Sequence, residues 1–190
     1  MHNLLYLHGF KSSPFSVKAQ LTKQYFKKNY PDVNFYCPQL MSSPLNAIDQ
    51  IDTILAGKSE ESWGLIGSSL GGYFSTYFAE KYNFKAVCIN PAVKPYKLLE
   101  DFMGEHENPY THEKFTVESQ HIEQLLQLDR EIIQKNLYLV MVQTGDEVLN
   151  YLEAVEKYDG CQFIKQHGGD HSFVDFEKML PNIAKFFDLV

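Results

Sequence analysis

Short apolar runs alternate along this chain with segments whose apolar residues recur every three or four positions. Six apolar runs predict strands, at residues 4–7, 33–37, 63–67, 85–90, 137–142 and 161–165. Helical spacing predicts helices near residues 15–30 and 43–57, after residue 69, and at residues 181–189. This alternation is typical of an α/β domain with a mainly parallel sheet of about six strands and helices on both faces.

A polar segment interrupts the alternation between the fourth and fifth predicted strands. Residues 93–135 are rich in Glu, His and Gln, and one helical face would be covered by Leu125, Leu126, Leu128 and Ile132. We expect a mostly helical insertion that folds over the C-terminal ends of the strands as a small lid. Residues 1–190 otherwise form one expected domain, because no linker or repeat divides them. The charged run at 58–61 predicts a solvated loop.

Composition narrows the class of protein without identifying it. A chain of 190 residues with 44% hydrophobic residues can build one sizeable core. Its formal net charge of −7 argues against nucleic acid and anionic membranes as partners. The three cysteines form no C-x-x-C pair, so we expect neither a metal site nor a disulfide framework. The first residues lack the pattern of a signal peptide or a membrane span, which predicts a cytoplasmic protein.

The most informative local pattern is Gly-Ser-Ser-Leu-Gly at residues 67–71, between a predicted strand and a predicted helix. A G-x-S-x-G turn in that context presents its serine at the edge of a sheet as a nucleophile. Gly67 and Gly71 leave room for the strand and the helix to approach closely. We therefore interpret Ser69 as the candidate nucleophile.

A nucleophilic serine needs a base and an orienting acid, which should follow it in the order Ser, Asp, His. Asp146 follows the predicted strand at 137–142, and His171 follows a Gly-Gly turn after the last strand. We assign His171 as the general base and Asp146 as the carboxylate that orients it. The rival acids are Glu147, Asp159 and Asp170, and the rival base is His167.

Two backbone N–H groups should stabilise the oxyanion that this chemistry creates. One is expected from Leu70, which directly follows the nucleophile at a helix N-terminus. The other is expected from Phe10, because the loop at residues 8–10 lies beside the serine if the first strand neighbours the third. Gly9 allows that loop to turn, and His8 is expected to hold the loop rather than act as a second base. His106, His112 and His121 are expected on the surface.

Six segments give the chain a specific resemblance to a known family. They are LHGFKSSP (7–14), GSSLGGY (67–73), NPAVKPY (90–96), NPYT (108–111), TGDEVL (144–149) and GDHSF (169–173). Together they span nearly the whole chain, which resembles the α/β-hydrolases and, more narrowly, the small bacterial YqiA/YcfP-like esterases (UPF0227).

This resemblance implies an α/β-hydrolase fold and a serine esterase or thioesterase that needs no cofactor. Its expected partner is a small acyl ester of short to medium chain length. A peptidase or an acyltransferase would use the same three residues, and the sequence does not separate them. A non-catalytic binding protein with this fold is the remaining alternative.

Overall fold

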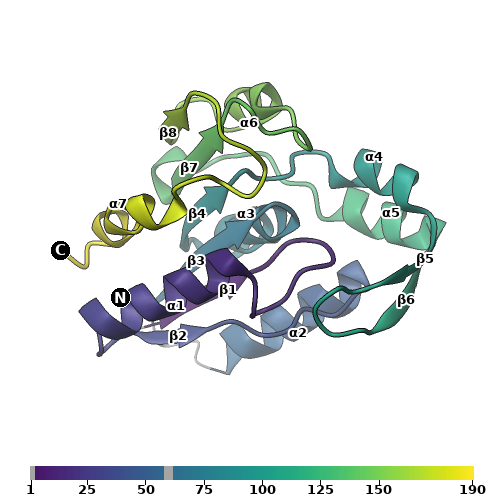
Figure 1. The fold of residues 1–190 in the computed structure, drawn as a ribbon, viewed down its shortest axis with the longest axis horizontal. Helices are drawn as coiled ribbons and strands as arrows, with labels where there is room; N and C mark the ends of the chain where they lie inside the picture. The colour runs from purple at the N-terminus through teal and green to yellow at the C-terminus, as the bar shows by residue number, and fades with distance from the viewer. Residues whose placement is uncertain (1–2, 58–61) are drawn as a thin grey trace.

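In the computed structural model, which describes residues 3–57 and 62–190, a six-stranded parallel sheet runs through the centre of the molecule (Figure 1). The strand order is β2-β1-β3-β4-β7-β8. The strands are β1 (Asn3–Leu7), β2 (Asn34–Tyr36), β3 (Trp63–Ser68), β4 (Lys85–Ile89), β7 (Tyr138–Gln143) and β8 (Gln162–Gln166). The predicted α/β class and all six predicted strands are confirmed; the loop predicted at 58–61 lies outside the described residues.

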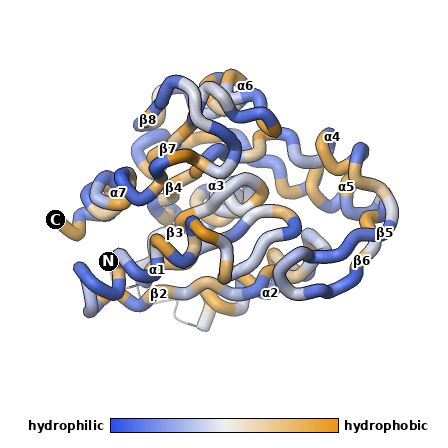
Figure 2. The backbone as a smooth tube through the Cα atoms, in the orientation of Figure 1, coloured by the Kyte–Doolittle hydropathy of each residue, from blue (hydrophilic) through white to orange (hydrophobic). Residues whose placement is uncertain are grey.

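Helices cover both faces of the sheet because the strands are apolar on both sides. Leu5 and Leu7 of β1 pack in one core cluster, and Leu4 and Tyr6 pack in the other. The first cluster includes residues of α2 (Pro44–Ala56), α3 (Leu70–Tyr82) and α6 (Tyr151–Lys157). The second includes α1 (Val17–Asn29), η3 (Phe176–Met179) and α7 (Leu180–Phe186). Figure 2 shows the hydrophobic residues concentrated along the central strands.

The segment between β4 and β7 lies at one end of the molecule, away from both termini (Figure 1). Its elements are α4 (Pro95–Leu99), η1 (Glu100–Phe102), β5 (Gly104–Glu107), β6 (Lys114–Val117), α5 (Ser119–Gln127) and η2 (Lys135–Leu137). The expectation of a mostly helical insertion missed the antiparallel β5–β6 hairpin. Most of the hairpin's side chains are exposed or half-buried, so it has no apolar run that would reveal a strand.

Strand β1 pairs with β2 on one side and with β3 on the other, so the strand order reverses there. Leu7 lies opposite Gly67, which brings the loop after β1 beside the turn after β3. The first and third strands are thus neighbours, which is the condition under which the loop at residues 8–10 was expected beside the serine. Ligands of open α/β sheets bind at such reversals, outside the C-terminal ends of the strands.

The turn after β3 packs so closely that Gly71 admits no side chain. A Cβ at Gly71 would lie 1.9 Å from the carbonyl oxygen of Leu7, and relieving that clash requires backbone movement. We expect Gly71→Ala to lower the free energy of unfolding by about 3 kcal/mol or more. Chemical denaturation measures this effect, with Gly57→Ala as the control, because a Cβ at Gly57 has its nearest contact at 3.4 Å. A Gly71→Ala protein as stable as the Gly57→Ala protein would contradict the prediction.

Candidate active site

Ser69 occupies the sharp turn between β3 and α3 in a strained backbone conformation. Its φ of 56° and ψ of −120° lie in a region that residues with a side chain rarely adopt, at a cost of about 1–3 kcal/mol. Two hydrogen bonds hold it there: the Ser69 N–H donates to Ile89 O at 3.0 Å, and the Ala92 N–H donates to Ser69 O at 3.1 Å. The loop after β4 therefore fixes the turn that exposes the Ser69 hydroxyl.

A continuous hydrogen-bonded chain links three of the predicted residues. His171 Nε2 lies 3.2 Å from Ser69 Oγ, and His171 Nδ1 lies 2.8 Å from Asp146 Oδ2. A proton on Nδ1 satisfies the carboxylate and leaves Nε2 as the acceptor for the serine hydroxyl. The structure thus brings together a serine, an acid and a base that lie far apart in the chain. Asp146 follows Ser69 by 77 residues, and His171 follows Asp146 by 25.

Asp146 is held in place by its surroundings as well as by the histidine. Its side chain is only 2% exposed, and Oδ1 accepts the N–H groups of Val148 at 2.9 Å and Leu149 at 2.8 Å. Burial alone would raise the pKa of this carboxyl group. The hydrogen bonds from His171, Leu149 and Val148 outweigh burial and lower the pKa below its ordinary value. Asp146 is therefore ionised at neutral pH.

Two buried amide side chains hold the loop that carries His171, which we call the histidine loop. Neither was predicted from the sequence as a site residue. Asn90 Nδ2 donates to the carbonyl oxygens of Asp170 at 3.1 Å and His171 at 3.4 Å, and its Oδ1 accepts the Gln143 N–H. Gln143 Oε1 accepts the N–H groups of Asp170 at 3.0 Å and Val174 at 2.9 Å. Both amides are 3% exposed. A lone polar residue at the C-terminal end of an apolar strand was the available signal for each.

The rival acids and the rival base take other positions. Glu147 Oε2 accepts the backbone N–H of His171 at 3.0 Å, so Glu147 steadies the loop without touching the imidazole. Asp170 Oδ1 accepts the hydroxyl of Ser172. Asp159 and His167 are exposed, and no hydrogen bond among the described residues joins either to Ser69 or His171.

The two expected oxyanion donors both line the cavity that contains Ser69. Leu70 is the first residue of α3, and Phe10 belongs to the loop after β1. Neither the Phe10 N–H nor the Leu70 N–H donates a hydrogen bond to any residue in 3–57 or 62–190. Both groups are therefore free to donate to a substrate oxygen.

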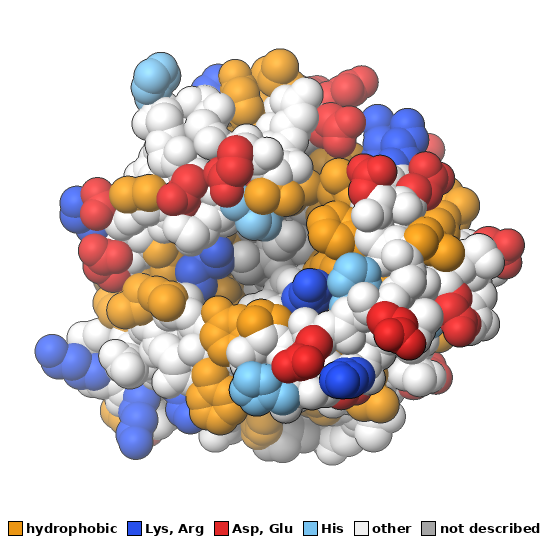
Figure 3. Space-filling view, turned by 45° about the vertical axis from the view of Figure 1, so that its right-hand side comes forward, with side chains coloured by type: hydrophobic (Ala, Val, Ile, Leu, Met, Phe, Trp, Pro, Cys, Tyr) orange, Lys and Arg blue, Asp and Glu red, His pale blue; other side chains and the backbone are white. Residues whose placement is uncertain are grey.

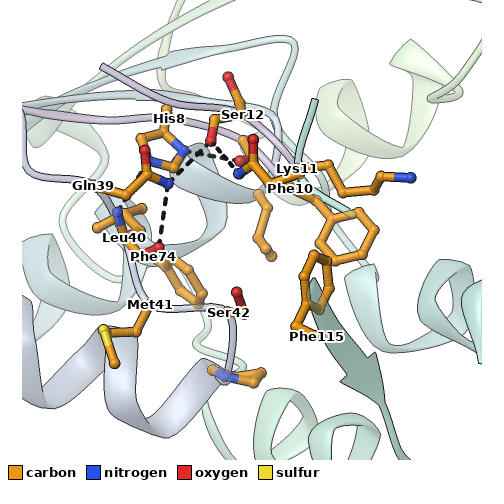
Figure 4. A pocket seen from close by; sticks show the side chains of 14 residues that line it. His8, Phe10, Lys11, Ser12, Gln39, Leu40, Met41, Ser42, Phe74 and Phe115 are labelled. Atoms are coloured by element: carbon orange, nitrogen blue, oxygen red, sulfur yellow. Dashed lines mark hydrogen bonds between the residues drawn. The ribbon is translucent and has the colours of Figure 1, made fainter. Parts of the chain in front are cut away.

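His8 anchors the loop after β1 that carries Phe10, which we call the Phe10 loop. Its Nδ1 donates to Gly9 O at 3.0 Å, and its Nε2 accepts the Leu40 N–H at 3.0 Å, which requires a neutral ring. Burial lowers the pKa of His8 in agreement with that state. Figure 4 shows His8, Gln39 and Ser12 gathered on one side of a small pocket behind the loop, with Phe10 and Phe115 on the other.

The insertion packs against the Phe10 loop. The Phe10 ring contacts the rings of Phe102 and Phe115 at centroid distances of 5.6 and 5.8 Å. The buried Asn108 Nδ2 donates to Ser12 O at 3.0 Å. His106, expected on the surface, is instead half-buried beside Phe10 at 6.2 Å between centroids. The hairpin thus supports the loop that carries an expected oxyanion donor.

Two cavities meet at Ser69. Figure 3 shows a hollow in the surface of the molecule, with hydrophobic, basic and histidine side chains around it. One cavity is apolar, about 300 Å³ in volume, and the insertion forms part of its wall. Its walls include Pro95, Leu98, Leu99, Phe102, Val117, Leu125 and Leu149. The half-buried His121, also expected on the surface, lines it too. The other cavity has a volume of about 240 Å³ and more polar residues in its lining than the first, and we call it the polar cavity.

Within residues 3–57 and 62–190, no three His, Cys, Asp or Glu side chains gather as metal ligands would. The cysteines Cys37, Cys88 and Cys161 are unpaired. Over the same residues, no helix has both the length and the apolar character that crossing a membrane requires.

The sequence matches the family described as "Uncharacterised protein family (UPF0227)" over residues 3–188. The chain belongs to this family. The resemblance read from the six sequence segments is thereby confirmed.

Solved structures place this UPF0227 protein among the α/β-hydrolase folds. Est1E from Butyrivibrio proteoclasticus with bound ferulic acid is 12% identical, with a TM-score of 0.73 over 100% of this chain and 88% of that one. Mouse alpha/beta hydrolase domain-containing protein 10 is 16% identical, with a TM-score of 0.73 and coverages of 98% and 90%. The monoacylglycerol lipase of Paleococcus ferrophilus is 15% identical, with a TM-score of 0.71 and coverages of 97% and 93%. At these identities the similarity establishes the fold.

Proposed function

We propose that this UPF0227 protein is a serine hydrolase that cleaves esters or thioesters of short- to medium-length acyl groups. The observation that carries the proposal is the hydrogen-bonded chain from Asp146 through His171 to Ser69. Its similarity in fold to an esterase and a lipase agrees with this class of reaction.

In the first half of the reaction, Ser69 Oγ attacks the acyl carbonyl carbon while His171 Nε2 takes the hydroxyl proton. Asp146 stabilises the imidazolium that forms. The negative charge that develops on the carbonyl oxygen is stabilised by the free N–H groups of Phe10 and Leu70. His171 then gives its proton to the leaving alcohol or thiol, the bond to that group breaks, and the acyl group remains on Ser69.

In the second half, water attacks the acyl-enzyme by the same route. His171 removes a proton from the water molecule, and the tetrahedral intermediate again places its charge toward Phe10 and Leu70. Collapse of that intermediate returns the proton to Ser69 Oγ and releases the carboxylic acid. The enzyme is thereby restored, because the proton taken from water replaces the one that left with the alcohol or thiol.

The size of the apolar cavity predicts the acyl preference. Its volume of about 300 Å³ lies at the lower end of the roughly 300–1,000 Å³ of small-molecule sites. We expect kcat/KM for p-nitrophenyl esters to peak at short to medium acyl chains in a series from acetate to decanoate. Leu98→Trp, which fills part of this cavity, should move the peak to shorter chains, whereas Leu152→Trp on the exposed face of α6 should not.

The acyl series also tests the proposal itself. Measurable turnover that disappears in Ser69→Ala supports a serine hydrolase. Folded wild-type protein that hydrolyses none of the esters contradicts it. A peak that stays at the same chain length in Leu98→Trp would remove the apolar cavity from acyl binding.

A further inference from the structure

The polar cavity reaches the nucleophile, as the apolar cavity does. The residues that line both cavities are Ser69, His171 and Phe10, so the two spaces meet where the proposed reaction occurs. A substrate whose scissile bond lies at Ser69 would extend into both. Because the apolar cavity suits an acyl chain, the polar cavity is left for the alcohol or thiol part of the substrate.

One positive side chain lines the polar cavity. The half-buried Lys18, in the first turn of α1, donates to Ser172 O at 2.8 Å and to His171 O at 3.5 Å. An ammonium group has three donors, so one remains after these contacts. Within the described part of the chain, no carboxylate lies within 4.0 Å of Lys18 Nζ, so Lys18 forms no direct ion pair, although Asp170 and Asp146 act on its charge from further away.

The rest of the lining suits a negative group. No Asp or Glu lines the cavity, although the chain as a whole carries a formal charge of −7. Hydroxyl groups line it instead, including those of Ser12, Ser16 and Tyr110. The start of α1 also opens here, and its N–H groups add to the positive potential.

We propose that the polar cavity binds a carboxylate or phosphate group carried by the alcohol or thiol part of the substrate, with Lys18 as its counter-charge. This inference rests on the proposed hydrolase function and adds a substrate class to it. Burial lowers the pKa of Lys18 to about 8, although Asp170 and Asp146 act in the opposite direction. A bound anion would offset that loss by stabilising the ammonium form.

A pair of esters that differ only in charge tests the inference. The butyrate esters of 4-hydroxybenzoate and 4-hydroxybenzamide have nearly the same shape, and only the first carries a carboxylate. We expect Lys18→Met to lower the ratio of their kcat/KM values, anionic over neutral, by about 10- to 100-fold. Lys23→Met, on an exposed position of the same helix, should keep the wild-type ratio.

The ratio separates charge recognition from support of the histidine loop. If Lys18 only holds the loop through Ser172 O, both esters lose activity equally and the ratio is unchanged, which would overturn the inference. Lys18→Arg, which keeps the charge, should retain part of the ratio. Inhibition by 4-hydroxybenzoate and by phenyl phosphate, compared in the wild type, distinguishes a carboxylate site from a phosphate site.

A binding measurement keeps the inference separate from the proposed activity. In Ser69→Ala, calorimetry should show the anionic ester binding at least about tenfold more tightly than the neutral ester, and Lys18→Met in that background should abolish the difference. Equal binding of the two esters would overturn the anion site. Failure of wild type to hydrolyse the neutral ester would instead overturn the hydrolase proposal, whatever the binding result.

Discussion

Replacing Ser69 by alanine is expected to lower kcat for a p-nitrophenyl butyrate substrate by about 10⁴- to 10⁶-fold. The change removes the only hydroxyl in hydrogen-bond contact with His171 Nε2 among the described residues, while the turn and the helix after it keep their contacts. Steady-state kinetics measures the loss. Thermal unfolding should show that the variant remains folded and about as stable as wild type, because alanine keeps the Cβ atom and the backbone hydrogen bonds that hold the turn.

Replacing His171 by alanine tests the general base in the same way. It should lower kcat about as much as Ser69→Ala does. The double variant should have a kcat no lower than that of either single variant, because the two groups act as a unit. Losses that multiplied in the double variant would show that the two residues act independently. Turnover near the wild-type level in either single variant would contradict the assigned chemistry.

Asp146→Asn is expected to lower kcat by about 10⁴-fold. Asp146 Oδ1 is occupied by two backbone N–H groups, so the other side-chain atom must meet His171 Nδ1. In asparagine that atom is an NH₂ donor, which favours the His171 tautomer with its proton on Nε2. Such an imidazole cannot accept the Ser69 proton.

The control for this variant is another acid from the same part of the chain. Asp159→Asn should leave kcat unchanged, because Asp159 is exposed and its ion-pair partner is the exposed Lys135 at 4.0 Å. Kinetics across pH, with circular dichroism to verify folding, makes the comparison. An Asp146→Asn enzyme within tenfold of wild type would move the orienting role to another carboxylate.

The sequence was sufficient to predict the sheet because its central strands, β1, β3, β4 and β7, are buried on both faces and therefore apolar. Apolar runs such as β7, in which all six residues are buried, differ clearly from the polar segments on either side of them. The β5–β6 hairpin could not be found in this way. Glu105, Glu107 and Lys114 are exposed, and the hairpin is stabilised instead by its contacts with the Phe10 loop, which lies about one hundred residues earlier.

At the site, motif order predicted which residues meet, and the fold determined how they are held. Ser69, Asp146 and His171 could be proposed because each follows a recognisable strand. The roles of Asn90 and Gln143 depend on the pairing of β4 with β7, which sets their amides beside the histidine loop. The lone polar residue at the end of each apolar strand marks the position, but it does not show which loop its amide will meet. The same holds for Lys18, which reaches the loop from a helix 153 positions away from His171.

The most direct test of the central claim is the mass of the intact protein after incubation with a fluorophosphonate, which reacts with activated serines. We predict one adduct per wild-type chain, mapped by peptide analysis to Ser69 rather than to the adjacent Ser68, and no adduct in Ser69→Ala or His171→Ala. A folded wild-type protein that gains no adduct, or an adduct that persists in Ser69→Ala, would contradict the assignment of Ser69 as the nucleophile.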